Sequence, residues 1–88
     1  MNGNDPILEV RISFSSAMEK EYFATKAISV SSQNKIGRFD VLPQHINMIT
    51  LVFKNLSIKK DNQEELFYEF ERGLMEVSNN KVNIFLGI

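Results

Sequence analysis

The chain has 88 residues, which is enough for one domain with a thin core but leaves little room for a deep active-site cavity. Its net charge of −1 provides no basic field for a general nucleic-acid binder, and no apolar run approaches the ~20 residues of a membrane-spanning helix. The absence of cysteine excludes disulfides, thiolate metal sites and cysteine catalysis. We expect residues 1–6 to form a flexible N-terminus and residues 7–88 to form a single domain.

The first sixty residues show the alternation of apolar and polar side chains that predicts β-strands. Ile7–Phe14 alternates cleanly, and Lys26–Ser31 repeats the pattern with Ile28 and Val30 pointing inward. Ser31–Lys35 is polar and typical of a turn. The other predictions for this part are a strand over Ile36–Leu42 that Pro43 interrupts, a buried strand over Ile46–Phe53, turns at Asn55 and Asp61-Asn62, and a short strand over Ser57–Lys59.

Residues 75–85, MEVSNNKVNIF, predict a β-hairpin in which Asn79 and Asn80 are the central residues of a type I′ turn. Both positions of such a turn require a positive φ, which asparagine tolerates better than most residues. Counting outward gives the pairs Val77–Val82 and Met75–Ile84 on an apolar side, and Ser78–Lys81 and Glu76–Asn83 on a polar side. Leu74 and Phe85 pair on that polar side. They are either an edge of the core wrapped by a neighbouring loop or an exposed apolar contact for a partner.

Two segments fit a helix and a strand equally well. In Gln63–Arg72, the preceding Asp61 and Asn62 resemble a helix cap and the apolar residues have helical spacing, yet Leu66, Tyr68 and Phe70 also alternate. Ser16–Lys26 has the same ambiguity. The residue pattern alone therefore predicts a mostly β domain with room for one or two helices.

The sequence contains no recognisable catalytic or metal site. His45 is the only histidine, so it has neither a second histidine nor a cysteine with which to bind zinc, and no nucleophile-elbow pattern accompanies it. Its expected role is in a loop after Pro43 or in a contact with a partner. The glycines form no phosphate-binding pattern, and the carboxylates are scattered. We therefore expect a binding or structural protein with no cofactor and no bound metal.

Two stretches resemble the epsilon subunit of F-type ATP synthases. Residues 37–45, GRFDVLPQH, look like that family's G-x-F-G-I-L-P-x-H segment, and residues 72–82, RGLMEVSNNKV, resemble its G-G-F-L-E-V-x-x-N-x-V segment. The two motifs have the family's order and separation, and the resemblance extends from about Ile7 to Leu86. The chain departs from the family pattern at three positions: Arg38 stands where an acidic residue is frequent, Asp40 where glycine is common, and Ile46 where a small residue is usual.

The resemblance implies an all-β fold, the flattened β-sandwich of about ten short strands that forms the family's N-terminal domain. Both ambiguous segments then become strands, with Glu21–Ala27 paired to the first strand, and Gly73 lies where a side chain would crowd a neighbour. The family's two C-terminal helices, which carry its brake on ATP hydrolysis, have no counterpart before Ile88. We therefore expect neither that brake nor a nucleotide site in this polypeptide.

The resemblance also implies a function, which is to link the gamma subunit to the ring of c subunits and to support torque transmission in proton-driven ATP synthesis. The expected gamma contacts are Leu42, Pro43 and His45, and the expected c-ring loop is Gly37, Arg38 and Phe39. The domain would be non-catalytic and peripheral to the inner or thylakoid-type membrane on its cytoplasmic face, held there through the complex. The alternatives are a free-standing β-sandwich that binds a ligand through its phenylalanines, and a small hydrolase that depends on His45.

Overall fold

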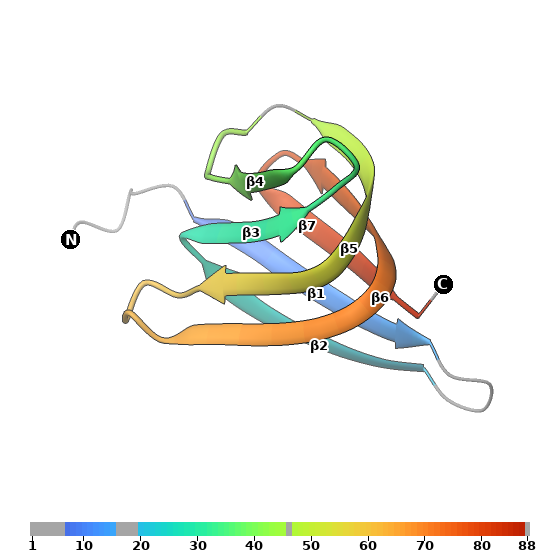
Figure 1. Ribbon diagram of the computed structural model, residues 1–88. Coiled ribbons are helices and arrows are strands. Elements are labelled where there is room, and N and C mark those ends of the chain that lie inside the picture. Colours follow the sequence, from blue (N-terminus) through green and yellow to red (C-terminus); the bar gives the residue numbers. More distant parts are fainter. Residues whose placement is uncertain (1–6, 16–19, 46, 88) are drawn as a thin grey trace.

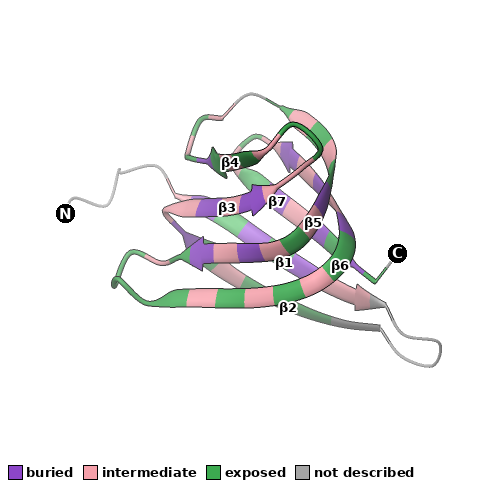
Figure 2. Ribbon diagram, in the orientation of Figure 1, coloured by how far each residue is buried: buried purple, intermediate pink, exposed green. Residues whose placement is uncertain are grey.

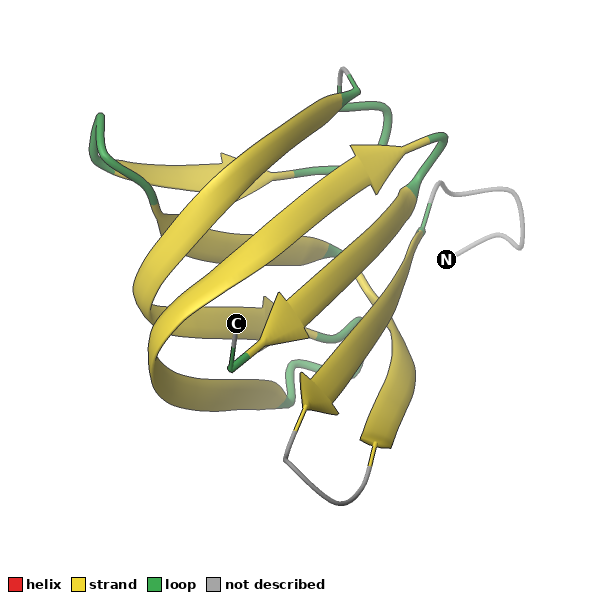
Figure 3. Ribbon diagram, turned by 90° about the vertical axis from the view of Figure 1, so that its right-hand side faces the viewer, coloured by secondary structure: helices red, strands yellow, loops and turns green. Residues whose placement is uncertain are grey.

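The computed structural model describes residues 7–15, 20–45 and 47–87, which contain seven β-strands and no helix (Figures 1 and 3). The strands are β1 (Leu8–Ser15), β2 (Lys20–Ala27), β3 (Ser29–Gln33), β4 (Arg38–Val41), β5 (Met48–Lys59), β6 (Glu65–Ser78) and β7 (Lys81–Leu86). The predicted flexible N-terminus and the departure at Ile46 lie outside the described residues. The predicted all-β class is confirmed.

One sheet folds over on itself to make the two layers of the sandwich. The strand order is β2-β1-β7-β6-β5-β3-β4, and every pair is antiparallel except β1 and β7. Figure 1 shows β5 and β6 curving from one layer into the other. The front layer therefore contains β4, β3, the C-terminal half of β5 and the N-terminal half of β6. The back layer contains the other halves of β5 and β6 together with β7, β1 and β2 (Figures 1 and 3).

A β-bulge lies where the two long strands bend. Phe53 pairs with Arg72, but the next residue of β5, Lys54, pairs with Phe70, so Glu71 is an extra residue on β6. Lys54 has a φ of 77°. A bulge of this kind bends a strand and increases its twist. It also changes which side chains point inward: they are Leu66, Tyr68 and Phe70 before the bulge and Gly73, Met75 and Val77 after it.

The core lies between the two layers: every strand contributes at least one buried side chain, and buried positions alternate with more exposed ones along most strands (Figure 2). Fully buried side chains include Ile12 of β1, Val30 of β3, Leu56 of β5, Met75 of β6 and Ile84 of β7. The outer side of each strand carries polar residues and a smaller set of exposed apolar ones. This alternation is what a sheet with one buried face requires.

Both ambiguous segments are extended. Gln63–Arg72 enters β6, and the described part of Ser16–Lys26 belongs to β2, so the helical alternative is wrong for the described residues. The Lys26–Ser31 prediction is wrong in one respect, because β2 ends at Ala27 and β3 begins at Ser29. Between them the chain passes from the back layer into the front layer, and the N–H of Ile28 donates to the carbonyl of Lys59 at 2.8 Å.

The predicted break at Asn55 is also wrong, since Asn55 lies inside the continuous strand β5 and its carbonyl accepts a 2.8 Å hydrogen bond from the buried Ser32 hydroxyl. The predicted turn over Ser31–Lys35 begins later than expected, because β3 runs to Gln33. The resemblance implied about ten short strands, whereas the described residues form seven. The number is lower because β5 and β6 are long, continuous strands of 12 and 14 residues that each cross both layers. The predicted turn at Asp61-Asn62 is confirmed.

The hairpin of residues 75–85 is confirmed in every pair. Met75 faces Ile84, Glu76 faces Asn83, Val77 faces Val82 and Ser78 faces Lys81. Asn79 and Asn80 have φ values of 51° and 62°, as a type I′ turn requires. Gly73 lies within β6, and a Cβ there would approach Leu86 Cδ2 to 2.8 Å and the carbonyl oxygen of Phe85 to 2.9 Å. The predicted crowding at this glycine is therefore present.

Candidate functional site

The two loops expected to contact partners lie at opposite ends of β4. This strand has four residues, so roughly 10 Å separates its first and last Cα atoms. Gly37, Arg38 and Phe39 lie where the strand begins, and Leu42, Pro43 and His45 follow its end. The sequence motif of residues 37–45 thus forms two separate surfaces joined by one edge strand of the front layer.

The turn at residues 34–37 is held by a single side chain. Asn34 Oδ1 accepts hydrogen bonds from the N–H groups of Ile36 (2.9 Å) and Gly37 (3.2 Å), while the Asn34 N–H donates to the Gly37 carbonyl at 3.0 Å. Gly37 has a φ of 148°, which only glycine adopts readily. The turn leaves Ile36 97% exposed. Asp40 stands where the epsilon family commonly has glycine, yet it lies in β4 and does not have a positive φ. Its Oδ1 accepts a hydrogen bond from the Ser31 hydroxyl at 2.6 Å.

Residues 42–45 form a hydrogen-bonded β-turn in which the His45 N–H donates to the Leu42 carbonyl at 3.0 Å. Pro43 occupies the second position and Gln44 the third, with a φ of 70°. A proline followed by a positive φ identifies a type II turn. Leu42 is exposed, whereas Pro43 and His45 are half-buried. This turn contacts the hairpin turn, because the Gln44 N–H donates to Asn80 Oδ1 at 2.6 Å.

An exposed row of apolar side chains crosses the outer side of the back layer. Leu51 pairs with Leu74, Leu74 with Phe85, Phe85 with Ser13, and Ser13 with Tyr22. We call Leu51, Leu74, Phe85 and Tyr22 the apolar row. Five adjacent strands at about 4.8 Å spacing make it ~19 Å long. Phe85 is 39% exposed and Leu74 is half-buried, and neither is buried by the described loops.

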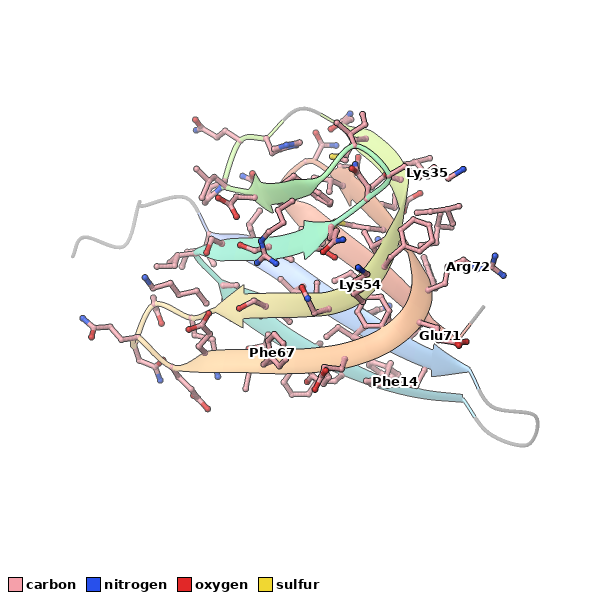
Figure 4. The ribbon with its side chains drawn as sticks, viewed as in Figure 1. Phe14, Lys35, Lys54, Phe67, Glu71 and Arg72 are labelled. Carbon is pink, nitrogen blue, oxygen red and sulfur yellow. The ribbon has the colours of Figure 1, made fainter. Side chains whose placement is uncertain are left out.

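The apolar row extends beyond β5. Ile49, two residues before Leu51, is 69% exposed on the same side. Ile36, Ile49 and Leu51 line one shallow groove. This groove connects the apolar row to the turn at residues 34–37. Figure 4 shows Lys35 at this turn and Arg72 at the bend of β6, both extending away from the sandwich.

Basic side chains outnumber acidic ones around the apolar row. Lys26 and Lys81 flank Glu9 in one cross-strand line, and the Arg11 guanidinium lies 5.1 Å from the centre of the Tyr22 ring. Among the residues that the structure describes, the acidic groups on this side are Glu9 and Glu76, and Glu76 accepts a hydrogen bond from Asn83 at 3.3 Å. The N-terminal half of β6 in the front layer has the opposite character, with outward-pointing Glu65, Glu69 and Glu71.

Within the described ranges, no group of three or more His, Asp or Glu side chains could hold a metal ion. No helix long and apolar enough to cross a membrane occurs in the part of the chain that the structure describes. What the described residues offer is an outer sheet surface with exposed apolar side chains, which suits binding.

Sequence reasoning named Leu74 and Phe85 but missed their neighbours Leu51, Ile49 and Tyr22. The parallel pairing of β1 with β7 and the bulge in β6 decide which side chains line up across the sheet, and neither has a sequence signal of its own. Exposed apolar residues in an alternating strand could have indicated the row, because Ile49 and Leu51 share one side of β5.

Residues 11–86 match the family model described as "ATP synthase, Delta/Epsilon chain, beta-sandwich domain". A solved structure of the Euglena gracilis mitochondrial ATP synthase (OSCP/F1/c-ring in rotational state 1) contains a chain with a similar fold, with a TM-score of 0.75 and 16% identity. That match covers 98% of this chain, which spans about half (54%) of the neighbour's length. No curated protein matches the chain by sequence. From the extent of the family match, the chain belongs to the β-sandwich-domain family of the ATP synthase delta and epsilon chains.

Proposed function

We propose that the chain is the sandwich domain of a central-stalk subunit in a rotary F-type ATP synthase, where it links the gamma subunit to the c ring and supports torque transmission. Family membership supports this proposal, and the structural neighbour comes from a complex that contains F1 and the c-ring. The domain performs no chemistry of its own in this role. It is peripheral to the membrane and is held there through the complex.

The observation that carries the proposal is the apolar row. A line of exposed Leu, Phe and Tyr side chains about 19 Å long is unfavourable in water and marks a surface that a partner covers. An α-helix of roughly 13 residues has the same length. The basic surroundings favour a helix of the gamma subunit whose apolar stripe is flanked by acidic residues.

The two turns extend this surface. The turn at Leu42, Pro43 and His45 adds a second gamma contact beside the hairpin. The turn that ends at Gly37, Arg38 and Phe39 contacts the c ring, with Ile36 as its exposed apolar tip. The basic Arg38 suits acidic or carbonyl groups in the polar loops of the ring.

The test is a calorimetric titration of the chain with its cognate gamma subunit. We expect a stable complex, and no detectable heat at roughly tens of micromolar would reject the proposal. Phe85→Ala should weaken binding by about 1–2 kcal/mol, because it removes an aromatic side chain from the middle of the apolar row. Phe67→Ala is the matched control: Phe67 is 61% exposed but lies on the front layer, so its loss should leave the affinity unchanged (Figure 4).

A further inference from the structure

We infer that Asn80 is a positioning residue. Its side chain holds Gln44 at a positive φ and so keeps the Leu42–His45 turn in the type II form. That this form is the one the gamma subunit binds rests on the function proposed above. The inference joins two parts of the chain that are 36 residues apart, the hairpin turn and the turn after β4.

The conformation of Gln44 needs an explanation. The third position of a type II turn has a positive φ and normally holds glycine or asparagine. Here it holds glutamine with a φ of 70°, where the Cβ is too close to the backbone. Without a compensating contact, the turn would be free to relax to a form with negative φ at this residue. Such a change would reorient the peptide between Pro43 and Gln44 and move Leu42 relative to His45.

Asn80 supplies the compensating contact. Its Oδ1 accepts the Gln44 N–H at 2.6 Å, the same N–H whose direction depends on the turn type. Asn80 is itself fixed, because it belongs to the type I′ turn and its carbonyl accepts the N–H of Glu9 in β1 at 2.8 Å. The acceptor is therefore presented from a rigid position in the sheet.

A second contact joins the same two segments. The Asn79 N–H donates to Asn47 Oδ1 at 3.4 Å, so the hairpin turn and the segment after His45 are bonded in both directions. The Asn79 bond uses the backbone of the hairpin, whereas the Asn80 bond uses a side chain. This difference explains why asparagine is useful at position 80: glycine is equally suited to a type I′ turn but has no acceptor to offer.

The experiment compares Asn80→Gly with the matched control Asn79→Gly. Both keep a residue that favours positive φ in the hairpin turn, and both keep every backbone bond, but only Asn80→Gly removes the acceptor for Gln44. Solvent exchange of the Gln44 amide proton is measured by NMR on the free chain, with the melting temperature as a check on folding. We expect exchange at Gln44 to rise about tenfold in Asn80→Gly and to stay unchanged in Asn79→Gly.

Two further variants separate positioning from general stability. Asn80→Asp keeps an acceptor oxygen and should restore slow exchange at Gln44. Adding Gln44→Gly to Asn80→Gly removes the strain that the contact offsets, so the turn should regain its form without the contact. Affinity for the gamma subunit should fall several-fold in Asn80→Gly and recover in the double variant.

The outcomes distinguish this inference from the proposed function. Equal Gln44 exchange in wild type and Asn80→Gly would overturn the inference, whatever the gamma affinity. Faster Gln44 exchange with unchanged gamma affinity would support the contact but overturn the binding half of the inference, since the turn form would then be irrelevant to binding. If the wild-type chain does not bind gamma at all, the proposed function fails and, with it, the binding half of the inference, while the exchange comparison still decides the contact.

Discussion

Gly73 provides a quantitative test of the packing between β6 and β7. Replacing it with alanine places a Cβ 2.8 Å from Leu86 Cδ2, 2.9 Å from the Phe85 carbonyl oxygen and 3.4 Å from Val52 Cγ2. The leucine methyl group is the end of a side chain and can rotate, but the carbonyl oxygen belongs to the backbone of β7 beside the Gly73–Leu86 pair. Relief therefore requires β7 to shift away from β6.

The magnitude follows from two opposing terms. Overpacking in a tight core costs about 1–3 kcal/mol, whereas alanine recovers about 0.4–1 kcal/mol by restricting the unfolded chain. The net loss should be about 1.5 kcal/mol, which for a domain of this size lowers the melting temperature by roughly 6–12 °C. Thermal unfolding followed by circular dichroism measures this shift. A melting temperature unchanged within about 1 °C would refute the view that β7 packs directly against the Gly73 backbone.

Three other changes test the surface. His45→Ala should weaken the gamma complex by about 1 kcal/mol and leave the melting temperature unchanged, because His45 is a half-buried residue in a loop. Calorimetry measures the affinity and thermal unfolding measures the stability; a variant that unfolds would show that His45 is structural. Ile36→Ser should reduce association with an isolated c ring about threefold or more without changing stability, since Ile36 is 97% exposed; an unchanged pull-down yield would argue against this turn as the ring contact. Raising salt should slow gamma association roughly tenfold, and Lys26→Gln combined with Lys81→Gln should flatten that dependence in stopped-flow measurements; an identical salt slope would mean that the basic surroundings do not steer the partner.

The hairpin was predictable because its information is local. Two asparagines that accept positive φ fix the turn, and the alternation on both sides then fixes every pair by counting. The strand character of Gln63–Arg72 was not predictable from the residues alone. Leu66, Tyr68 and Phe70 alternate as a strand requires, but the preceding Asp61 and Asn62 resemble a helix cap and the apolar residues also have helical spacing. The family resemblance supplied that assignment.

The candidate site was only partly predictable for a similar reason. Residues 37–45 were identified through a motif, but their division into two turns at opposite ends of β4 is a property of the fold. The contact between Gln44 and Asn80 joins residues far apart in sequence, and nothing in either stretch indicates the other. Pro43 does favour a turn, whereas glutamine at the next position gives no sign of a positive φ.

The apolar row and the two turns differ in how firmly their side chains are held. Leu74 lies between the buried Gly73 and Met75 in β6, and Phe85 lies between the buried Ile84 and Leu86 in β7. When both chain neighbours of an exposed residue pack in the core, its backbone is fixed, so its side chain projects from a set position. Leu42 and His45 have no such support from both sides and depend on hydrogen bonds between turns. We therefore expect the apolar row to supply most of the binding free energy, and the turn held by Asn80 to adjust its geometry.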